Sequence, residues 1–441
     1  MAPSTRTETL RALVQLLVDT SELVIKEWEM EEQHISYSDL PTSRLPSHEL
    51  YEARRIIRGA CGMCVDLIED PHVRILEVAT TFAMAQALDT TVRAGVPDIL
   101  AEAELPNGVS AEELSRRTGI DERKLVRVMH VLCSNGIYNE VKPLQFANTR
   151  LSRILAGNPP AKAAQLILYV ASAHLPAVLL DRNMTSATSN TDSAFQKAHG
   201  DERTLWDHIE TGDESDPAVR EMRGMFPLAM VGLGQMNSPA LIADFPWASL
   251  GEATVVDVGG GVGSMCLELV KLFPDLHFVV EDLPATIGEA KVTWDAEMPG
   301  FIQSGRVQLI THDFFEVQPV RGAAVYFLRY IIHDWPDDQC TTILSRLRDA
   351  LGPDSRILVA DMIMHPPLGS THLKSAPAPL PANYGNANAL KGMFDMLMLS
   401  LFNSTERTPE QLSALANGAG LKVEKIWECR GALSITELRK M

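Results

Sequence analysis

Cysteine is scarce in this sequence, and its placement is not that of a disulfide framework. Six cysteines are spread over 441 residues, at positions 61, 64, 133, 266, 340 and 429. Disulfide-stapled extracellular domains carry dense cysteine pairs, so this scatter predicts reduced thiols and a cytoplasmic protein. Cys61 and Cys64 form one CxxC without a second pair at zinc spacing, so we interpret them as ordinary helical thiols and expect no metal site.

Positive charge and long apolar runs are scarce as well. Lys and Arg total 39 against 57 Asp and Glu, which gives a formal net charge of −18. Phosphate backbones and anionic lipids repel such a protein, so we expect neither nucleic acid nor a membrane as partner. The most apolar stretch, 163–180, contains Gln165, His174 and Pro176. It predicts a buried helix or helix pair rather than a membrane span.

The remaining composition is that of a globular protein long enough for two or three domains, with 46% hydrophobic and 22% charged residues. Residues 1–75 predict an extension of two or three amphipathic helices, broken by a polar loop at 36–49. Residues 76–245 predict a mainly helical domain. In 246–441 strands alternate with helices, which predicts a mostly parallel sheet. The proline-rich segment 366–388 is expected to be a surface insertion.

Residues 110–148 have the pattern of a winged helix-turn-helix. Ser110 begins a capping box, Gly119 ends the first helix, Asp121 caps the second, and Gly136 precedes a short polar hairpin. Such a module can bind DNA, but the chain around it is acidic and its second helix has a wide apolar face. We therefore favour a packing or dimerisation module, and we retain a ligand-sensing DNA-binding regulator as the alternative.

A glycine-rich loop follows the apolar stretch VVDV and precedes a predicted helix. Each glycine costs about 1 kcal/mol relative to alanine, so four glycines within 259–263 indicate that bare backbone is needed. A phosphate-binding P-loop would end in a lysine, which is absent, and the dinucleotide fingerprint would have glycine where Ser264 stands. The remaining pattern, DxGxGxG from Asp257 to Gly263, resembles motif I of class I S-adenosylmethionine-dependent methyltransferases. A tight turn without a ligand is the alternative.

Two carboxylates end the next predicted strand, about twenty residues after the loop. These are Glu281 and Asp282 of FVVEDLP. At this edge of a doubly wound sheet a carboxylate accepts hydrogen bonds from both hydroxyls of a ribose. The spacing therefore favours a cofactor that contains a ribose.

The segment VYFLRYIIHDWPDDQC, residues 325–340, is the most specific in the chain. Together with DxGxGxG, FVVEDLP, THDFF, VADMI and ERTPEQ, it resembles the small-molecule O-methyltransferases of the plant caffeic-acid type and their fungal relatives, over roughly residues 80–441. The resemblance implies a class I methyltransferase fold: a Rossmann-like α/β domain with a mostly parallel seven-stranded sheet, preceded by a mainly α winged-helix dimerisation domain. It also implies S-adenosyl-L-methionine as cofactor and a homodimer.

Methyl transfer to oxygen needs a base that takes the hydroxyl proton. We expect the fourth strand of the sheet to end at His333, which fits this role, and the resemblance implies that Asp361 and Glu406 orient it. Asp334 is interpreted as a helix cap or loop residue. An ordinary histidine pKa of about 6.5 lies roughly 3.5 units below that of a phenol and much further below that of an aliphatic alcohol. We therefore expect a phenolic or enolic hydroxyl on a small aromatic or polyketide-like acceptor.

The resemblance also implies which residues contact the cofactor. Gly259 and Gly261 would lie against the methionine portion of the cofactor, Asp282 and Leu283 at its ribose, and Asp313 and Phe314 at its adenine. The Trp335 ring would pack on the adenine ring. Arg329 stands where plant members carry lysine. The predicted cofactor-binding residues are Asp257, Gly259, Gly261, Asp282, Leu283, Asp313, Phe314, Arg329 and Trp335.

Methionines cluster in two stretches with helical spacing, 225–236 and 393–398. Many such methionines pack in a core, but soft thioethers also suit a flat aromatic acceptor. The resemblance places both stretches beside the acceptor, so we expect Met230 and Met398 to line its pocket, with Phe195 and Trp206 as neighbours. An enzyme of the same fold that methylates nitrogen or another acceptor stays open.

Overall fold

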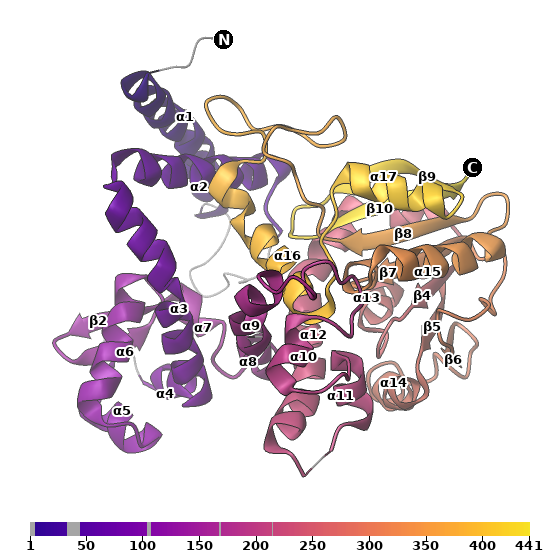
Figure 1. Cartoon of the computed structure of the whole chain (residues 1–441), viewed down its shortest axis with the longest axis horizontal. Coiled ribbons are helices and arrows are strands. Elements are labelled where there is room, and N and C mark those ends of the chain that lie inside the picture. The colour runs from indigo at the N-terminus through magenta and orange to yellow at the C-terminus, as the bar shows by residue number, and fades with distance from the viewer. Residues whose placement is uncertain (1–4, 33–44, 104–106, 167–168, 214) are drawn as a thin grey trace. The chain divides into compact units, whose positions relative to one another are not determined.

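The computed structural model describes residues 5–32, 45–103, 107–166, 169–213 and 215–441 (Figure 1). The chain forms two compact units, each built from separate segments. Unit 1 contains Met1–Leu67, Leu168–Glu210 and Gly234–Met441, and unit 2 contains Ile68–Ile167 and Thr211–Leu233. Most of the loop expected at 36–49 falls outside the described residues. The domain boundaries at 75 and 245 stay a prediction.

Unit 2 contains the elements of the expected winged helix-turn-helix. The Ser110 hydroxyl accepts the Glu113 N–H, Gly119 follows α5 with a φ of 73°, and Asp121 caps α6. A three-stranded sheet of order β1-β3-β2 forms the wing. The elements are α3 (Pro71–Arg93), α4 (Val96–Ala101), β1 (Val109–Ser110), α5 (Ala111–Thr118), α6 (Glu122–Ser134), β2 (Tyr138–Lys142), β3 (Gln145–Asn148), α7 (Arg150–Arg153), α8 (Pro159–Leu166) and the first part of α12 (Pro217–Asp244).

The centre of unit 1 is a seven-stranded sheet of order β6-β5-β4-β7-β8-β10-β9. Only β10 runs antiparallel to its neighbours, so the mostly parallel sheet expected from the sequence is confirmed. The strands are β4 (Thr254–Val258), β5 (His277–Asp282), β6 (Val307–Thr311), β7 (Val325–Arg329), β8 (Arg356–Asp361), β9 (Leu421–Glu428) and β10 (Ser434–Lys440).

Helices cover both faces of this sheet, which explains why its strands read as continuous apolar runs. Val255 and Phe327 pack with residues of α13 (Ser264–Leu272) and α14 (Pro284–Glu297) on one face. Val256 and Leu328 pack with α15 (Asp337–Ala350) and α17 (Pro409–Gly418) on the other. The carboxyl ends of the parallel strands meet at one edge, where sites form in sheets of this kind.

Further helices of unit 1 pack around α16. Leu175 of α9 and Ala194 of α10 share an apolar cluster with Leu399. Among the described helices, none is both long and apolar enough to cross a bilayer. The bounds are α9 (Tyr169–Leu179), α10 (Ala194–His199), α11 (Leu205–Thr211) and α16 (Ala389–Phe402), with short 3-10 helices η1 (Trp247–Leu250), η2 (Ile332–Asp334) and η3 (Gly385–Asn388).

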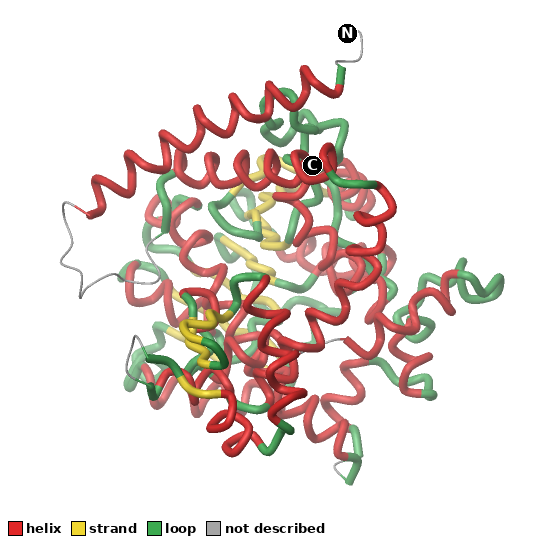
Figure 2. The backbone as a smooth tube through the Cα atoms, turned by 90° about the vertical axis from the view of Figure 1, so that its left-hand side faces the viewer, coloured by secondary structure: helices red, strands yellow, loops and turns green. Residues whose placement is uncertain are grey.

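The N-terminal extension and the segment 366–388 pack against each other. Helices α1 (Arg6–Glu32) and α2 (His48–Ile68) lie side by side (Figure 2). Leu380 is buried with Leu13 of α1 and Ala60 of α2. The backbone of Tyr384 approaches Gly59 so closely that a Cβ atom there would lie 2.4 Å from the Tyr384 carbonyl oxygen. The segment is therefore only partly the surface insertion expected from its prolines.

Because of this close approach, we expect alanine at position 59 to destabilise the protein, which is the opposite of the usual effect of replacing a helix glycine by alanine. Replacing an interior helix glycine by alanine ordinarily stabilises a protein by about 1 kcal/mol. Gly288→Ala, on α14 with no atom within 4 Å of the new Cβ, is expected to do so. Gly59→Ala is expected instead to lower the free energy of unfolding by about 1–3 kcal/mol, because the new methyl group overlaps backbone. Urea denaturation of both variants checks this, and equal stabilisation by the two would contradict the contact.

Candidate active site

The glycine loop joins β4 to α13 at the carboxyl edge of the sheet. Gly259 and Gly261 have φ values of 65° and 60°, a left-handed conformation that favours glycine. A Cβ atom at Gly259 would lie 2.7 Å from Cδ1 of Ile331, so a side chain has no room there. A Cβ atom at Gly261 would meet nothing within 4 Å. The backbone at Gly261 therefore borders open space, as a cofactor cradle requires.

Asp257 and Arg329, both predicted to contact the cofactor, make their polar contacts within the protein. Asp257 is 3% exposed and accepts a hydrogen bond from the Cys266 thiol. Burial raises the pKa of Asp257, and the positive charge of Arg329 opposes that rise. The Arg329 guanidinium donates to the hydroxyls of Ser238 at 2.9 Å and Ser264 at 2.8 Å. These contacts fix the start of α13, while a direct role of either residue at the cofactor stays a prediction.

Asp282 ends β5 beside the loop. Its two carboxylate oxygens accept the backbone N–H groups of Gly261 and Leu283, each at 2.8 Å. The Thr286 side chain also hydrogen-bonds this carboxylate, and because a carboxylate offers about four acceptor positions, it is fixed in place and can still accept a hydroxyl group. Burial raises the pKa of Asp282, and the two N–H contacts lower it.

Glu210, at the end of α11, adds a carboxylate that the motifs do not indicate. Burial raises the pKa of Glu210, and the charges of Asp207, Asp282 and Asp313 raise it further. The charges of Asp282 and Asp313 therefore act on Glu210. Glu210 lies about seventy residues before Asp282, so no local sequence pattern could have linked the two.

Aromatic side chains follow the glycine loop along the same edge. The Trp335 ring lies edge-on to Phe314, with centroids 5.9 Å apart, and to Phe315 at 5.0 Å. A Cβ atom at Gly259 would lie 3.3 Å from Phe314, so this cluster adjoins the loop. Asp313 is held by the Phe315 N–H, which donates to its carboxylate at 2.9 Å. Open backbone, a fixed carboxylate and aromatic rings together fit a cofactor with a charged sulfur, a ribose and a flat base.

His333 lies four residues beyond the end of β7, in the 3-10 turn η2. The expectation that the strand ends at His333 is therefore wrong, because Tyr330 adopts a φ of 60° and turns the chain out of the sheet. His333 is 6% exposed, and its Nδ1 lies 2.7 Å from Oε1 of Glu406. Asp395 of α16 fixes Glu406 in turn, since its carboxylate accepts the Glu406 N–H at 2.8 Å. The sequence motifs did not indicate Asp395.

Three carboxylates determine the protonation of His333. Burial by itself would lower the pKa of His333, but the charges of Glu406, Asp334 and Asp361 and the Glu406 hydrogen bond outweigh burial and raise it to about 10. Burial raises the pKa of Asp334 to about 7 and that of Asp361 to about 6. The imidazole is therefore a stronger base than an ordinary histidine.

The two aspartates act on His333 differently from what the sequence suggested. Asp334 is not a helix cap, because its carboxylate lies 3.3 Å from Nε2 of His333. The Asp361 carboxylate accepts its hydrogen bond from the Tyr330 N–H, at 3.1 Å, rather than from His333. Asp361 therefore acts on the imidazole through its charge, and Glu406 through a direct hydrogen bond.

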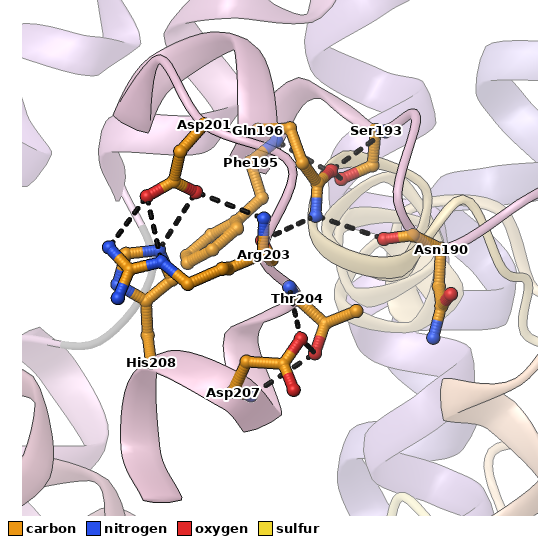
Figure 3. Close-up of polar contacts among 9 residues, drawn as sticks. All are labelled: Asn190, Ser193, Phe195, Gln196, Asp201, Arg203, Thr204, Asp207 and His208. Carbon is orange, nitrogen blue, oxygen red and sulfur yellow. Dashed lines mark hydrogen bonds and ion pairs between the residues drawn. The ribbon is translucent and has the colours of Figure 1, made fainter. Parts of the chain in front are cut away.

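The residues expected around the acceptor are less exposed than pocket walls usually are. Phe195 is 2% exposed, and its ring centroid lies 4.3 Å from that of His199. It also lies 5.3 Å from the ring of His208, which Figure 3 shows beside it. Asp201 holds His208 there at 3.2 Å. Trp206 stacks on Phe402 at 5.5 Å.

Both expected methionines lie on helices. Met398 is 5% exposed on α16, whereas Met393 and Met396 of the same helix are 64% and 47% exposed. Met230 lies on the part of α12 that belongs to unit 2. That Met230, Met398 and Phe195 line an acceptor pocket stays a prediction.

Comparison with known proteins assigns two segments of the chain to domain families. Residues 182–422 match the model of the O-methyltransferase domain, and residues 76–158 match that of the O-methyltransferase dimerisation domain. The chain is similar to the O-methyltransferase gedA of Aspergillus terreus, at 40% identity over 89% of this chain and 87% of that protein. It is also similar to the O-methyltransferase tpcA of Aspergillus fumigatus, at 37% identity over 96% and 94%.

Solved structures share the fold. The crystal structure of OxaC in complex with SAH and oxaline has a TM-score of 0.71 and 22% identity, over 99% of this chain and all of that one. At this identity the likeness shows a common architecture. From its family matches and its curated relatives, the chain belongs to the S-adenosylmethionine-dependent O-methyltransferases.

Proposed function

We propose that this O-methyltransferase methylates a phenolic or enolic oxygen of a small aromatic, polyketide-like acceptor, with His333 as general base. Its relatives place it among enzymes of the secondary-metabolite type, and S-adenosylmethionine is the methyl donor. The observation that carries the proposal is the 2.7 Å contact between Glu406 and Nδ1 of His333. Because Glu406 holds Nδ1 at 2.7 Å and Asp334 lies farther from Nε2, at 3.3 Å, Nε2 is the nitrogen that would take a proton from an acceptor.

Different residues of the site bind the cofactor and transfer the proton. S-adenosylmethionine, when bound, supplies a methyl group on a positively charged sulfur. Gly261 and Asp282 would hold its amino-acid and ribose portions. His333 takes the acceptor's hydroxyl proton on Nε2, so that the oxygen lone pair becomes available for bond formation with carbon. Glu406 stabilises the imidazolium that results, and the proton leaves to solvent before the next turnover.

The basicity of His333 determines which class of acceptor hydroxyl group it can deprotonate. With its pKa raised to about 10, His333 matches a phenol, whose pKa is also about 10, so proton transfer between them costs little. An aliphatic alcohol has a pKa near that of water, about 15.7, and proton transfer would then cost roughly 8 kcal/mol. Phenols and enols are therefore the acceptors that this base can serve.

The test is a panel of acceptors with methyl-labelled S-adenosylmethionine. Phenols and enolisable 1,3-dicarbonyl compounds are expected to gain label on oxygen, identified by mass spectrometry, while amines, carboxylic acids and aliphatic alcohols of similar size are expected to gain little. Transfer chiefly to nitrogen would contradict the proposal. Absence of transfer to every acceptor, together with a mobility shift of duplex DNA at physiological salt, would favour the ligand-sensing regulator instead.

A homodimer forms part of the proposal. The dimerisation-domain match covers most of unit 2, and α3 exposes an apolar series that a second copy would cover. This series comprises Val73, Ile75, Leu76, Val78 and Phe82, each at least 45% exposed. We also propose a cytoplasmic location, which suits the six free cysteines.

A further inference from the structure

Tyr330 has an unusual backbone three residues before His333. Its φ of 60° lies in the left-handed region, which is unfavourable for a residue with a side chain because Cβ approaches the following carbonyl oxygen. Such residues persist where the surrounding structure holds them, and they cluster at functional sites. The contacts that hold Tyr330 therefore indicate what its conformation serves.

Tyr330 is held at its backbone and at the tip of its ring. Its N–H donates to the Asp361 carboxylate at 3.1 Å and to the Ala360 carbonyl at 3.3 Å. Its hydroxyl oxygen accepts a hydrogen bond from the Asn237 amide of α12 at 2.8 Å. The other end of that amide accepts the Ala432 N–H at 3.2 Å, so Asn237 is itself anchored. Burial raises the pKa of the Tyr330 hydroxyl, which keeps it neutral.

The same residue contacts two of the groups that define the base. The Tyr330 ring lies against the His333 imidazole, with centroids 5.5 Å apart and planes tilted by 35°. Its N–H fixes Asp361, whose charge helps to raise the pKa of His333. A shift of this tyrosine would move the imidazole relative to both Glu406 and Asp361.

We infer that Tyr330 and Asn237 are positioning residues of the methyl-transfer site, which hold the His333 imidazole against Glu406 and beside Asp361. The inference rests on the proposed role of His333 as general base. Asn237 fixes the ring through its hydroxyl, and the ring supports the imidazole. The left-handed turn at Tyr330 brings His333 out of the sheet to meet Glu406. Tyr330 and Asn237 act through His333 and exchange no proton with the acceptor.

A double-mutant cycle tests this inference. Asn237→Ala and Tyr330→Phe both remove the hydrogen bond between the amide and the ring hydroxyl and leave the ring in place, and Asn237→Ala also removes the acceptor of the Ala432 N–H. Each is expected to lower kcat by about 3- to 10-fold, the range of one hydrogen bond, with the acceptor KM changed less than about 2-fold. The double variant is expected to be no slower than the slower single variant, because Asn237→Ala already removes the hydrogen bond that Tyr330→Phe breaks.

Tyr384→Phe is a matched control. Tyr384 also has a left-handed φ, of 65°, is fully buried, and places its hydroxyl on the Glu52 carboxylate at 2.6 Å, in the segment that packs on α2. The control is expected to keep the kcat of the unchanged protein. Melting temperature and the stoichiometry of S-adenosylhomocysteine binding normalise every rate to folded sites, so a merely structural role would leave the normalised kcat unchanged.

Three results would overturn the inference: unchanged normalised kcat in both single variants, independent losses that multiply in the double variant, or an equal loss in Tyr384→Phe. His333→Ala separates these results from failure of the proposed function. An active His333→Ala enzyme removes the proposed base, and with it the inference. An inactive one, with Asn237→Ala and Tyr330→Phe fully active, removes the inference alone.

Discussion

His333→Ala is expected to lower kcat by about 100- to 10,000-fold, the contribution of a positioned general base. The imidazole is the nitrogen base that Glu406 holds at 2.7 Å, and alanine offers no atom to take the acceptor's proton. S-adenosylhomocysteine is expected to bind this variant normally, because Asp282 is held by the N–H groups of Gly261 and Leu283 and not by His333. Single-turnover kinetics and isothermal titration calorimetry measure the two quantities separately.

His365→Ala controls for the loss of a buried histidine. His365 is 4% exposed, and neither ring nitrogen has a hydrogen-bond partner among the described residues. This variant is expected to lose stability but to retain its rate per folded molecule. If His333→Ala kept more than about a tenth of the activity, His333 could not be the general base.

Glu406→Gln is expected to shift the pH dependence of the reaction and to slow it. The Glu406 charge and hydrogen bond raise the pKa of His333 to about 10, so removing the charge lowers that pKa. Since the base acts when neutral, the rising limb of kcat/KM should lie well above pH 7 in the unchanged enzyme and move at least one unit towards acid in the variant. The weaker base is expected to lower the plateau by about 10- to 100-fold.

Rates measured from pH 6 to 11, with a stability check at each pH, give both numbers. Glu410→Gln is the matched control, because Glu410 is exposed at the start of α17 and bonds Ser370. Its pH profile should coincide with that of the unchanged enzyme. If the rising limb of kcat/KM lay at the same pH in Glu406→Gln as in the unchanged enzyme, a group other than His333 would be responsible for it.

Local chemistry made much of the fold predictable. Ser110 and Asp121 cap α5 and α6, as the capping pattern of the sequence predicted. The glycine loop lies between β4 and α13, as its composition indicated, and Asp282 ends the next strand. Each of these features depends on residues within a few positions of one another.

The features that escaped prediction depend on contacts between distant segments. The end of β7 was placed four residues too late because Tyr330 is held in its turn by Asp361 and Asn237, which no strand pattern reveals. The anchoring of Glu406 by Asp395 joins a helix to a later loop. The prolines of segment 366–388 likewise could not predict that the segment packs on α2, because α2 is distant in the sequence.

The contact between Gly59 and Tyr384 also bears on the order in which the chain can fold. Helices α1 and α2 leave the ribosome early, yet Leu380, which completes their apolar cluster, is made only in the last fifth of synthesis. At about 5–20 residues per second, tens of seconds separate the two events. During that interval the nascent helices present an uncovered apolar surface, so chaperone engagement and translation speed are expected to govern the yield of native enzyme.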